Sequence, residues 1–262
     1  MSEYSFKAVI FDLDGVITQT AKVHSQAWEK MFNDFLRLRE ARYGEPFQEF
    51  THGKDYLAYV DGKPRYKGVE SFLISREIRI EYGNPTDSPD TESICGLGNR
   101  KNSNFNEILE KDGVEVFGST VEIIKDLKRK NIKIGVASSS KNCKPVLEAA
   151  GLIDLFETRV DGIVSVELNL KGKPEPDIFT TACDNLKVDY KKTIVVEDAV
   201  SGVQAGAKGG FGLVLGIARE NNETELRQNG ADRVIKDFSE ITLDDLEKWF
   251  RENMIIAPDT IQ

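Results

Sequence analysis

The stretch KAVIFDLDGVITQTAKVH, residues 7–24, contains the features that decide the fold. Its apolar start is typical of a strand buried on both faces of a parallel sheet. Asp12 and Asp14 follow where that strand ends, and Gly15 supplies the backbone freedom that a tight bend needs. A polar segment then leads to His24. The stretch therefore predicts a strand, an acidic loop and the beginning of a helix.

Buried-strand patterns recur later in the chain, and helical patterns separate them. Further strands are expected at 132–138, 193–198, 212–217 and 231–237. Helices are expected at 119–131, 142–151, 174–186 and 201–210. This alternation predicts an α/β fold in which a doubly wound parallel sheet carries helices on both faces.

The segment directly after the first strand has a different pattern. It lacks buried-strand runs and instead contains helical patterns at 20–40, 68–83 and 102–113. We therefore predict a helical cap domain of residues 19–107, inserted after the first strand of a core formed by 1–18 and 108–262.

Composition excludes several classes of protein. The 262 residues carry a net charge of −9, which argues against nucleic acid as a partner because such binding needs clustered cations. No apolar run approaches the roughly 20 residues that span a bilayer. We expect a cytoplasmic monomer without a membrane partner, since strand-like sequence begins too early for a signal peptide. Cys95, Cys143 and Cys183 lack metal-ligand spacing and are expected to be free thiols.

Polar and charged side chains follow several predicted strands, at the edge where parallel sheets bind ligands. These residues are Asp12, Asp14, Ser138, Ser139, Glu197 and Asp198, and Lys173 belongs to a loop just before a predicted helix. Crowded carboxylates repel one another unless a cation separates them, and their oxygens suit Mg²⁺. Each residue alone fits a turn, a helix cap or a solvated loop. Their joint occurrence at successive strand ends favours a reaction centre.

The chemistry expected from this set is phosphoryl transfer. Asp12 would attack phosphorus and form an aspartyl phosphate, while Mg²⁺ held by Asp12, a backbone carbonyl near Asp14, and Asp198 would screen the negative charge. Lys173 and Ser138 would stabilise the oxygens of the transferring group. The net negative charge of the chain does not argue against a small phosphate ester, which needs only a few local cations.

Two glycine-rich stretches resemble nucleotide-binding motifs without completing them. GLGNRK, residues 96–101, lacks the third glycine of a dinucleotide fingerprint and follows no strand. SGVQAGAKGG, residues 201–210, lies inside a predicted helix rather than before one. Neither stretch supports nucleotide binding.

FDLDGV, VASSS, the lysine of KGKPEPDIF, and VVEDAVSGVQAG occur in this order along nearly the whole chain. This order resembles the four motifs of the haloacid dehalogenase-like phosphotransferases. The resemblance implies a Rossmann-like core, a helical cap inserted after the first strand and a Mg²⁺ cofactor. It also implies that Asp12 is the nucleophile, Asp14 the general acid/base and Lys173 the charge-neutralising lysine.

Within that superfamily the sequence is most similar to the β-phosphoglucomutase branch, whose members interconvert β-glucose 1-phosphate and glucose 6-phosphate through a bisphosphate. FDLDGVITQTAKVHSQAW, RKNSNF and ASSSKN carry this similarity. It implies a sugar phosphate as the partner molecule. The site residues it implies are Thr20 and His24 at the cap hinge, Lys101 and Arg65 as cap cations, Ser138, Ser139 and Asn142 in the phosphate-binding loop, and Asp12, Asp14, Glu197 and Asp198 around the metal.

The core residues fit more than one activity. A phosphatase of the same superfamily uses the same strand-end residues, whereas a mutase must exclude water while its bisphosphate intermediate turns round. The cap cations Arg65 and Lys101 favour the mutase. His24 also fits a half-buried histidine satisfied by Thr20. A non-enzymatic phospho-receiver is a remote alternative, since such domains are shorter and lack a helical insertion.

Overall fold

The computed structural model describes residues 4–256. The chain divides into two compact units, which are considered separately. Unit 1 consists of Met1–Gln19 and Glu115–Gln262, and unit 2 is the intervening Thr20–Val114. The sequence placed the return to the core at residue 108, but helix α3 runs without a break to Asp112.

Unit 1 contains a six-stranded sheet in the order β3-β2-β1-β4-β5-β6, with every neighbouring pair parallel. The strands are β1 Ala8–Phe11, β2 Lys133–Ala137, β3 Thr158–Val160, β4 Thr193–Glu197, β5 Leu213–Ile217 and β6 Arg233–Ile235. The strand order reverses between β1 and β4, the point where open parallel sheets bind their ligands. The predicted doubly wound α/β core is confirmed.

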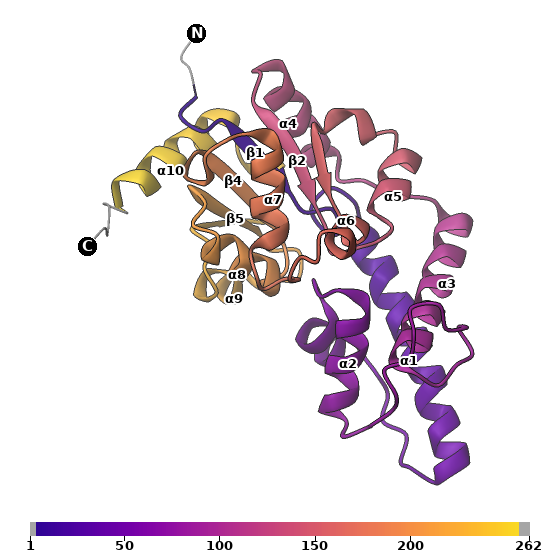
Figure 1. Ribbon diagram of the computed structural model, residues 1–262. Coiled ribbons are helices and arrows are strands. Elements are labelled where there is room, and N and C mark those ends of the chain that lie inside the picture. Colours follow the sequence, from indigo (N-terminus) through magenta and orange to yellow (C-terminus); the bar gives the residue numbers. More distant parts are fainter. Residues whose placement is uncertain (1–3, 257–262) are drawn as a thin grey trace. The chain divides into compact units, whose positions relative to one another are not determined.

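Helices cover both faces of this sheet (Figure 1). The α-helices of unit 1 are α4 Gly118–Arg129, α5 Cys143–Ala149, α6 Gly162–Glu167, α7 Asp177–Leu186, α8 Val200–Lys208, α9 Glu223–Gln228 and α10 Leu243–Ile256. Short 3₁₀ turns occupy Ile153–Leu155, Tyr190–Lys192 and Phe238–Glu240. Ile10 packs with α7 in one apolar cluster, whereas the neighbouring Phe11 contacts Phe238. Successive residues of β1 thus face opposite layers, as burial on both faces requires.

Unit 2 is helical. It contains α1 Thr20–Tyr43, a π-helix over His52–Val60, α2 Arg65–Ser75 and α3 Ile94–Asp112. Its apolar core centres on the rings of Phe32, Phe50 and Phe72, whose centroids lie 4.1–4.9 Å apart. A predicted helical insertion is confirmed in kind, and none of its described residues forms a strand of the sheet.

Two of the predicted cap helices have different bounds. The helix expected over 68–83 ends at Ser75, and Glu77 adopts a positive φ of 56°. Beyond it, Ile78 and Ile80 pack against the core of unit 2 with the two-residue period of extended chain. The helix expected from residue 102 begins at Ile94 instead, where the Ser93 hydroxyl accepts a hydrogen bond from the Gly96 amide.

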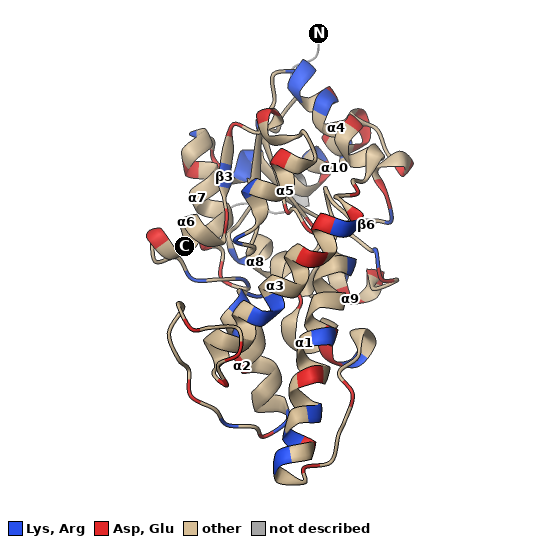
Figure 2. Ribbon diagram, turned by 90° about the vertical axis from the view of Figure 1, so that its right-hand side faces the viewer, with Lys and Arg blue, Asp and Glu red and all other residues tan. Residues whose placement is uncertain are grey.

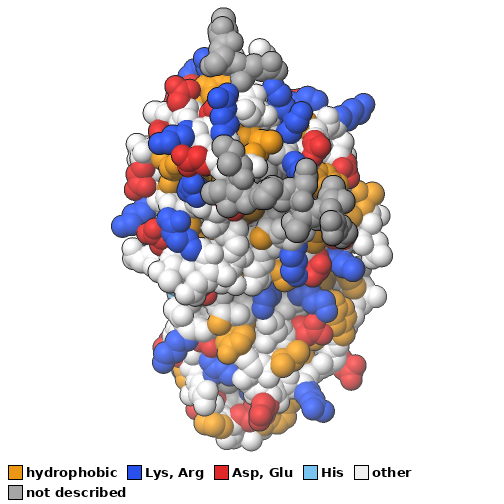
Figure 3. Space-filling view, turned by 90° about the vertical axis from the view of Figure 1, so that its left-hand side faces the viewer, with side chains coloured by type: hydrophobic (Ala, Val, Ile, Leu, Met, Phe, Trp, Pro, Cys, Tyr) orange, Lys and Arg blue, Asp and Glu red, His pale blue; other side chains and the backbone are white. Residues whose placement is uncertain are grey.

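Charged side chains of both signs are interspersed along the helices of each unit (Figure 2), and the face in Figure 3 shows the same mixture. Within residues 4–256, no helix combines the length and the apolar character that crossing a bilayer demands. All three cysteines are free, as predicted, and the structure shows that they are also buried.

Candidate active site

The end of β1 carries Asp12 into the middle of the sheet. Phe11 pairs with β2 on one side and with β4 on the other. The amide of Asp12 then donates a hydrogen bond of 2.9 Å to the carbonyl of Val196. The side chain of Asp12 is buried. Its carboxylate is therefore fixed at the point where the strand order reverses.

A tight loop after Asp12 carries Asp14 and passes close to Asp198, which follows β4. Gly15 has a φ of +85°, and its amide donates to the carbonyl of Thr18 at 2.8 Å. A Cβ atom at Gly15 would lie 1.8 Å from Oδ2 of Asp198, so only glycine lets the loop approach the end of β4 so closely. Asp14 lies on the same loop, and its Oδ2 is 3.5 Å from the hydroxyl oxygen of Ser138.

Lys173 joins two of the buried carboxylates. Its ammonium group donates a 2.5 Å hydrogen bond to Oδ1 of Asp12 and a second hydrogen bond to Oε1 of Glu197. The other oxygen of Glu197 accepts from the amides of Asp198 and Ala199, both at 2.9 Å. The loop before α7 and the end of β4 thus bring Lys173 and Glu197 to Asp12, as the strand-end pattern predicts.

The loop after β2 forms a compact turn of hydroxyl groups. Ser138 is buried, its amide donates to the carbonyl of Val160, and its hydroxyl accepts from the amide of Ser140. The Ser140 hydroxyl in turn accepts from the amide of Asn142. Ser139 lies between these residues and is partly exposed. Such a turn supplies hydroxyl and amide groups of the kind that bind phosphate oxygens.

Burial dominates the electrostatics of this cluster. Removal from water raises the pKa of Asp12 well above its usual range; Lys173 opposes the shift, and the charges of Glu197 and Asp14 reinforce it. Burial acts to lower the pKa of Lys173, but the adjacent charges of Asp12 and Glu197 outweigh it and raise that pKa. One lysine among four carboxylates leaves an excess of negative charge that favours a cation.

The carboxylates provide a donor set for such a cation. One oxygen each from Asp12, Glu197 and Asp198 lies within 4.8 Å of the others. Carboxylate oxygens are hard ligands of the kind that Mg²⁺ prefers, so the chemistry of the donors fits that ion. Lys173 uses Oδ1 of Asp12 and leaves Oδ2 for a cation, whereas both oxygens of Glu197 already accept hydrogen bonds. Its contacts favour Glu197 as the partner of Lys173 over the predicted role of direct ligand.

In unit 2, two of the predicted substrate-binding residues, His24 and Lys101, contact the ring of Phe105, and Thr20 lies on the same helix as His24. Thr20 begins α1, and His24 lies one turn further along the same helix. The Lys101 ammonium of α3 contacts Nδ1 of His24 and lies 4.7 Å from the ring centroid of Phe105. His24 stacks on Phe105 with ring centroids 4.1 Å apart. A buried cation, an imidazole and an aromatic face therefore share one site.

Arg65 begins α2 and contacts the residue that follows Lys101. Its guanidinium donates a 2.7 Å hydrogen bond to Oδ1 of Asn102. Burial lowers the pKa of Arg65. A Cβ atom at Gly98 would lie 2.7 Å from the Tyr66 ring and 3.3 Å from Cδ of Arg65. The glycines of GLGNRK thus have a packing role, because they let neighbouring segments approach α3.

Trp28 and Phe105 also belong to this group, and the sequence pattern did not single them out as site residues. Lys101 lies 5.3 Å from the centroid of Trp28, which is buried. Their spacing held a signal, since Trp28 follows His24 by four residues and Phe105 follows Lys101 by four. Residues at this spacing share a helix face.

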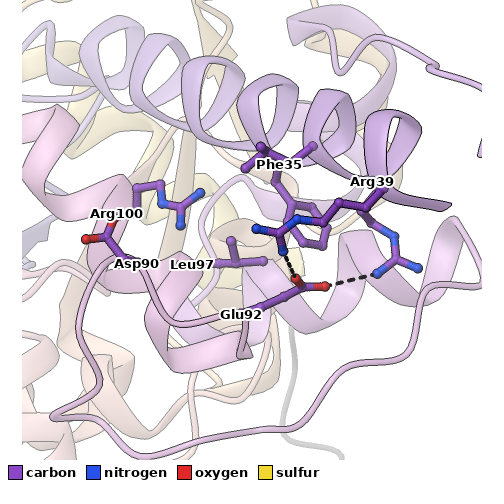
Figure 4. Close-up of a pocket in the computed structure, with 8 residues that line it drawn as sticks. Phe35, Arg39, Asp90, Glu92, Leu97 and Arg100 are labelled. Atoms are coloured by element: carbon purple, nitrogen blue, oxygen red, sulfur yellow. Dashed lines mark hydrogen bonds and ion pairs between the residues drawn. The ribbon is translucent and has the colours of Figure 1, made fainter. Parts of the chain in front are cut away.

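A hollow of about 50 Å³ in unit 2 is built from none of the predicted site residues (Figure 4). Arg39 donates to Glu92 and to Glu45, and Arg42 donates to the second oxygen of Glu92. Arg100 donates to the carbonyl of Pro89. These pairs fasten the loop before α3 to α1, so we interpret the hollow as a structural junction.

The sheet order, the acidic loop and the buried lysine form one charged site at the carboxyl ends of the strands, and comparison with known proteins identifies the class of enzyme. The profile of the haloacid dehalogenase-like hydrolases matches residues 6–210. The chain therefore belongs to the haloacid dehalogenase-like hydrolase family, and it is an enzyme.

Several similar proteins within this family carry the name β-phosphoglucomutase. A β-phosphoglucomutase of Mycobacterium bovis is 42% identical over 238 residues, covering 90% of this chain and 91% of that protein. A β-phosphoglucomutase of Bacillus subtilis is 32% identical, covering 93% and 95% of the two chains. The crystal structure of a β-phosphoglucomutase from Clostridium difficile has a TM-score of 0.75 at 23% identity, covering 95% of this chain and 99% of the other. This last likeness bears on the fold alone.

Proposed function

We propose that the chain is a Mg²⁺-dependent β-phosphoglucomutase, which converts β-glucose 1-phosphate to glucose 6-phosphate through a bisphosphate. The observation that carries this proposal is the contact in unit 2 between the buried ammonium of Lys101 and the half-buried ring of His24. A phosphatase needs only water as its second substrate, whereas a mutase must grip a sugar with a phosphate at each end. The similarity to named β-phosphoglucomutases supports the same choice.

The first chemical step is assigned to Asp12. Its carboxylate oxygen would attack the phosphorus of a bound phosphate ester, the bond from phosphorus to the leaving oxygen would break, and an aspartyl phosphate would form. Asp14 would give a proton to the leaving oxygen and later accept a proton from the attacking sugar hydroxyl. The loop geometry supports this division, since Gly15 turns Asp14 off the strand that carries Asp12.

Lys173, Ser138, Ser139 and Asn142 are assigned to the oxygens of the transferring group. We assign Mg²⁺ to the carboxylates of Asp12 and Asp198 and to a backbone carbonyl near Asp14, where it would neutralise charge between the phosphate and the carboxylates. Glu197 would keep Lys173 directed at Asp12, in agreement with its hydrogen bonds. In this scheme Lys173 has both carboxylates as partners before any substrate binds.

Thr20, His24, Lys101 and Arg65 are assigned to the sugar and its second phosphate. The ammonium of Lys101 and the guanidinium of Arg65 provide two cations linked through adjacent residues of α3. Arginine suits bidentate binding of phosphate, while lysine acts as a point charge. Two desolvated cations of different geometry fit a substrate that presents a phosphate and hydroxyl groups.

A sugar-phosphate phosphatase is the second candidate, because the same unit 1 residues perform hydrolysis when water reaches the aspartyl phosphate. The decisive experiment supplies pure β-glucose 1-phosphate with Mg²⁺ and a catalytic amount of the bisphosphate. Glucose 6-phosphate and inorganic phosphate are then followed in the same sample. Glucose 6-phosphate as the main product supports the mutase, and predominant release of inorganic phosphate overturns it in favour of the phosphatase.

A further inference from the structure

Arg219 lies just after β5 and joins the acidic loop to a distant part of unit 1. The exposed fraction of its side chain is 15%. Its Nε donates a 3.0 Å hydrogen bond to the carbonyl of Gly15. Its Nη1 donates to the carbonyl of Lys236 at 2.9 Å and to Oδ2 of Asp237 at 3.0 Å. One guanidinium therefore connects the loop after β1 with the segment after β6.

The contact with Gly15 bears directly on the position of Asp14. Glycine has the widest range of backbone conformations, so the loop needs outside contacts to hold one of them. Thr18 accepts from the amide of Gly15, and Asp198 fills the place where a Cβ would be. Arg219 provides the third contact, because its Nε donates a hydrogen bond to the Gly15 carbonyl. Gly15, the residue that follows Asp14, is thereby contacted at its amide, its Cα and its carbonyl.

Arg219 also contacts the segment on which the chain returns from unit 2. Its Cζ lies 3.6 Å from the ring centroid of Phe117, a cation–π contact. The amide of Phe117 donates to the carbonyl of Ile17 at 2.9 Å, and Thr18 forms an antiparallel bridge with Val116. Hydrogen bonds thus join Arg219 to the acidic loop, and the acidic loop to the segment around Phe117.

The geometry points to arginine specifically. A lysine ammonium cannot place planar donors on the Gly15 carbonyl and on Asp237 while its carbon stem lies flat on an aromatic ring. Asp237 is itself held, since its Oδ2 also accepts from the Ser119 hydroxyl at 2.8 Å. Asp237 therefore holds the guanidinium in the position from which it donates to the Gly15 carbonyl.

We propose that Arg219 is a positioning residue that holds the Gly15 loop so that Asp14 can protonate the leaving group. This inference rests on the acid/base role proposed above for Asp14. It predicts a defect that depends on the leaving group. Esters whose leaving oxygen needs a proton will suffer, whereas esters of strongly acidic phenols will not.

The test compares kcat/KM for a series of aryl phosphates, from strongly acidic phenols to phenol itself, whose pKa is about 10. The variants are Arg219→Gln, Arg219→Lys and, as a reference for loss of the acid, Asp14→Ala. The matched control is Arg233→Gln, because Arg233 pairs with Glu252 and contacts no part of the Gly15 loop. Thermal unfolding of every variant confirms that it is folded.

In both Arg219 variants, kcat/KM is expected to fall about tenfold or more for the poorest leaving groups and little for the best. Asp14→Ala should show the same trend across the series. A loss by the same factor across the series, or no loss, overturns the proposal, since a purely structural role moves all esters together. Wild-type conversion of β-glucose 1-phosphate, measured in parallel, tests the mutase separately. If the wild type does not convert β-glucose 1-phosphate but the Arg219 variants show the expected dependence on the leaving group, only the mutase assignment is overturned.

Discussion

The ammonium of Lys173 donates a 2.5 Å hydrogen bond to the carboxylate of Asp12. Both side chains are buried, and the same ammonium also contacts Glu197. Removing one member of a buried charged group leaves its partners desolvated and unpaired, which costs more than the pair itself contributes. Lys173 therefore supports the fold of unit 1 as well as the chemistry assigned to it.

Replacing Lys173 with methionine should lower the free energy of unfolding by about 3–5 kcal/mol when no divalent cation is present. Mg²⁺ should restore part of this loss, because it supplies the positive charge that the variant lacks. Urea unfolding with and without Mg²⁺ measures both effects. Lys171→Met, an exposed lysine on the same loop, is the control. Equal stability of the two variants would contradict the prediction.

Asp12→Asn should reduce mutase activity and aryl phosphate hydrolysis together, by a factor on the order of 10⁴ or more, because the amide cannot form an aspartyl phosphate. Acid quenching followed by intact mass measurement should show a phosphorylated wild-type chain and none in the variant. The exposed Asp154→Asn keeps the charge change without touching the site. A phosphorylated Asp12→Asn chain would place the nucleophile elsewhere.

Lys101→Met should impair mutase turnover far more than hydrolysis of 4-nitrophenyl phosphate. The small aryl ester has no second phosphate or sugar hydroxyl for the buried ammonium to hold. Charge-assisted contacts of this kind contribute about 1.5–3 kcal/mol, which corresponds to a loss of roughly 10- to 150-fold. Lys111→Met, exposed on the same helix, should change neither activity. Equal losses in the two assays for Lys101→Met would remove the argument for the mutase.

The acidic loop was predictable because it repeats a simple rule, that polar residues at the carboxyl ends of parallel strands meet at one edge. The position of a residue after a predicted strand or in a loop was enough to select Asp12, Ser138 and Lys173 as candidates. Arg219 could not be found in this way. Its role depends on the carbonyl of Gly15 and on Asp237, and the chain folds these together across more than 200 positions of sequence.

The bounds of the helices in unit 2 were harder to predict for a local reason. Gly96 and Gly98 are typical of a break in a helix, yet both lie inside α3. A Cβ at Gly96 would lie 2.2 Å from the carbonyl oxygen of Thr91, so close packing explains the choice of glycine. In unit 1, the short strand β3 and helix α6 were also missed. A strand of three residues, of which only Val160 is buried, and a helix of six residues give little periodicity.

Gly98→Ala tests this packing. The added methyl group would clash with the Tyr66 ring and press on Arg65, so these side chains, or the beginning of α2 that carries them, must shift. We expect a loss of about 1–3 kcal/mol in unfolding free energy, together with a raised KM for the sugar phosphate. Gly53→Ala is a matched control, because its Cβ meets open space. An unchanged KM in Gly98→Ala would separate the position of Arg65 from substrate binding.

Asp237 predicts a pH dependence of stability. Burial acts to raise its pKa, but hydrogen bonds from Ser239, Ser119 and Arg219 outweigh burial and hold the pKa well below its usual range. A carboxylate whose pKa is lowered by folding stabilises the native state above its unfolded pKa of about 3.9, and this contribution is lost as the pH falls below that value.

Asp237→Asn should therefore be less stable than the wild type at pH 7 and should lose less stability between about pH 5 and pH 3. Urea unfolding at several pH values in this window measures the difference between the two slopes. Asp154→Asn serves again as the exposed control for the loss of one carboxylate. If the free energy of unfolding of Asp237→Asn depends on pH as that of the wild type does, the hydrogen bonds to Asp237 do not favour its charged form. The contact of Asp237 with Arg219 would then hold the guanidinium less firmly than the structure implies.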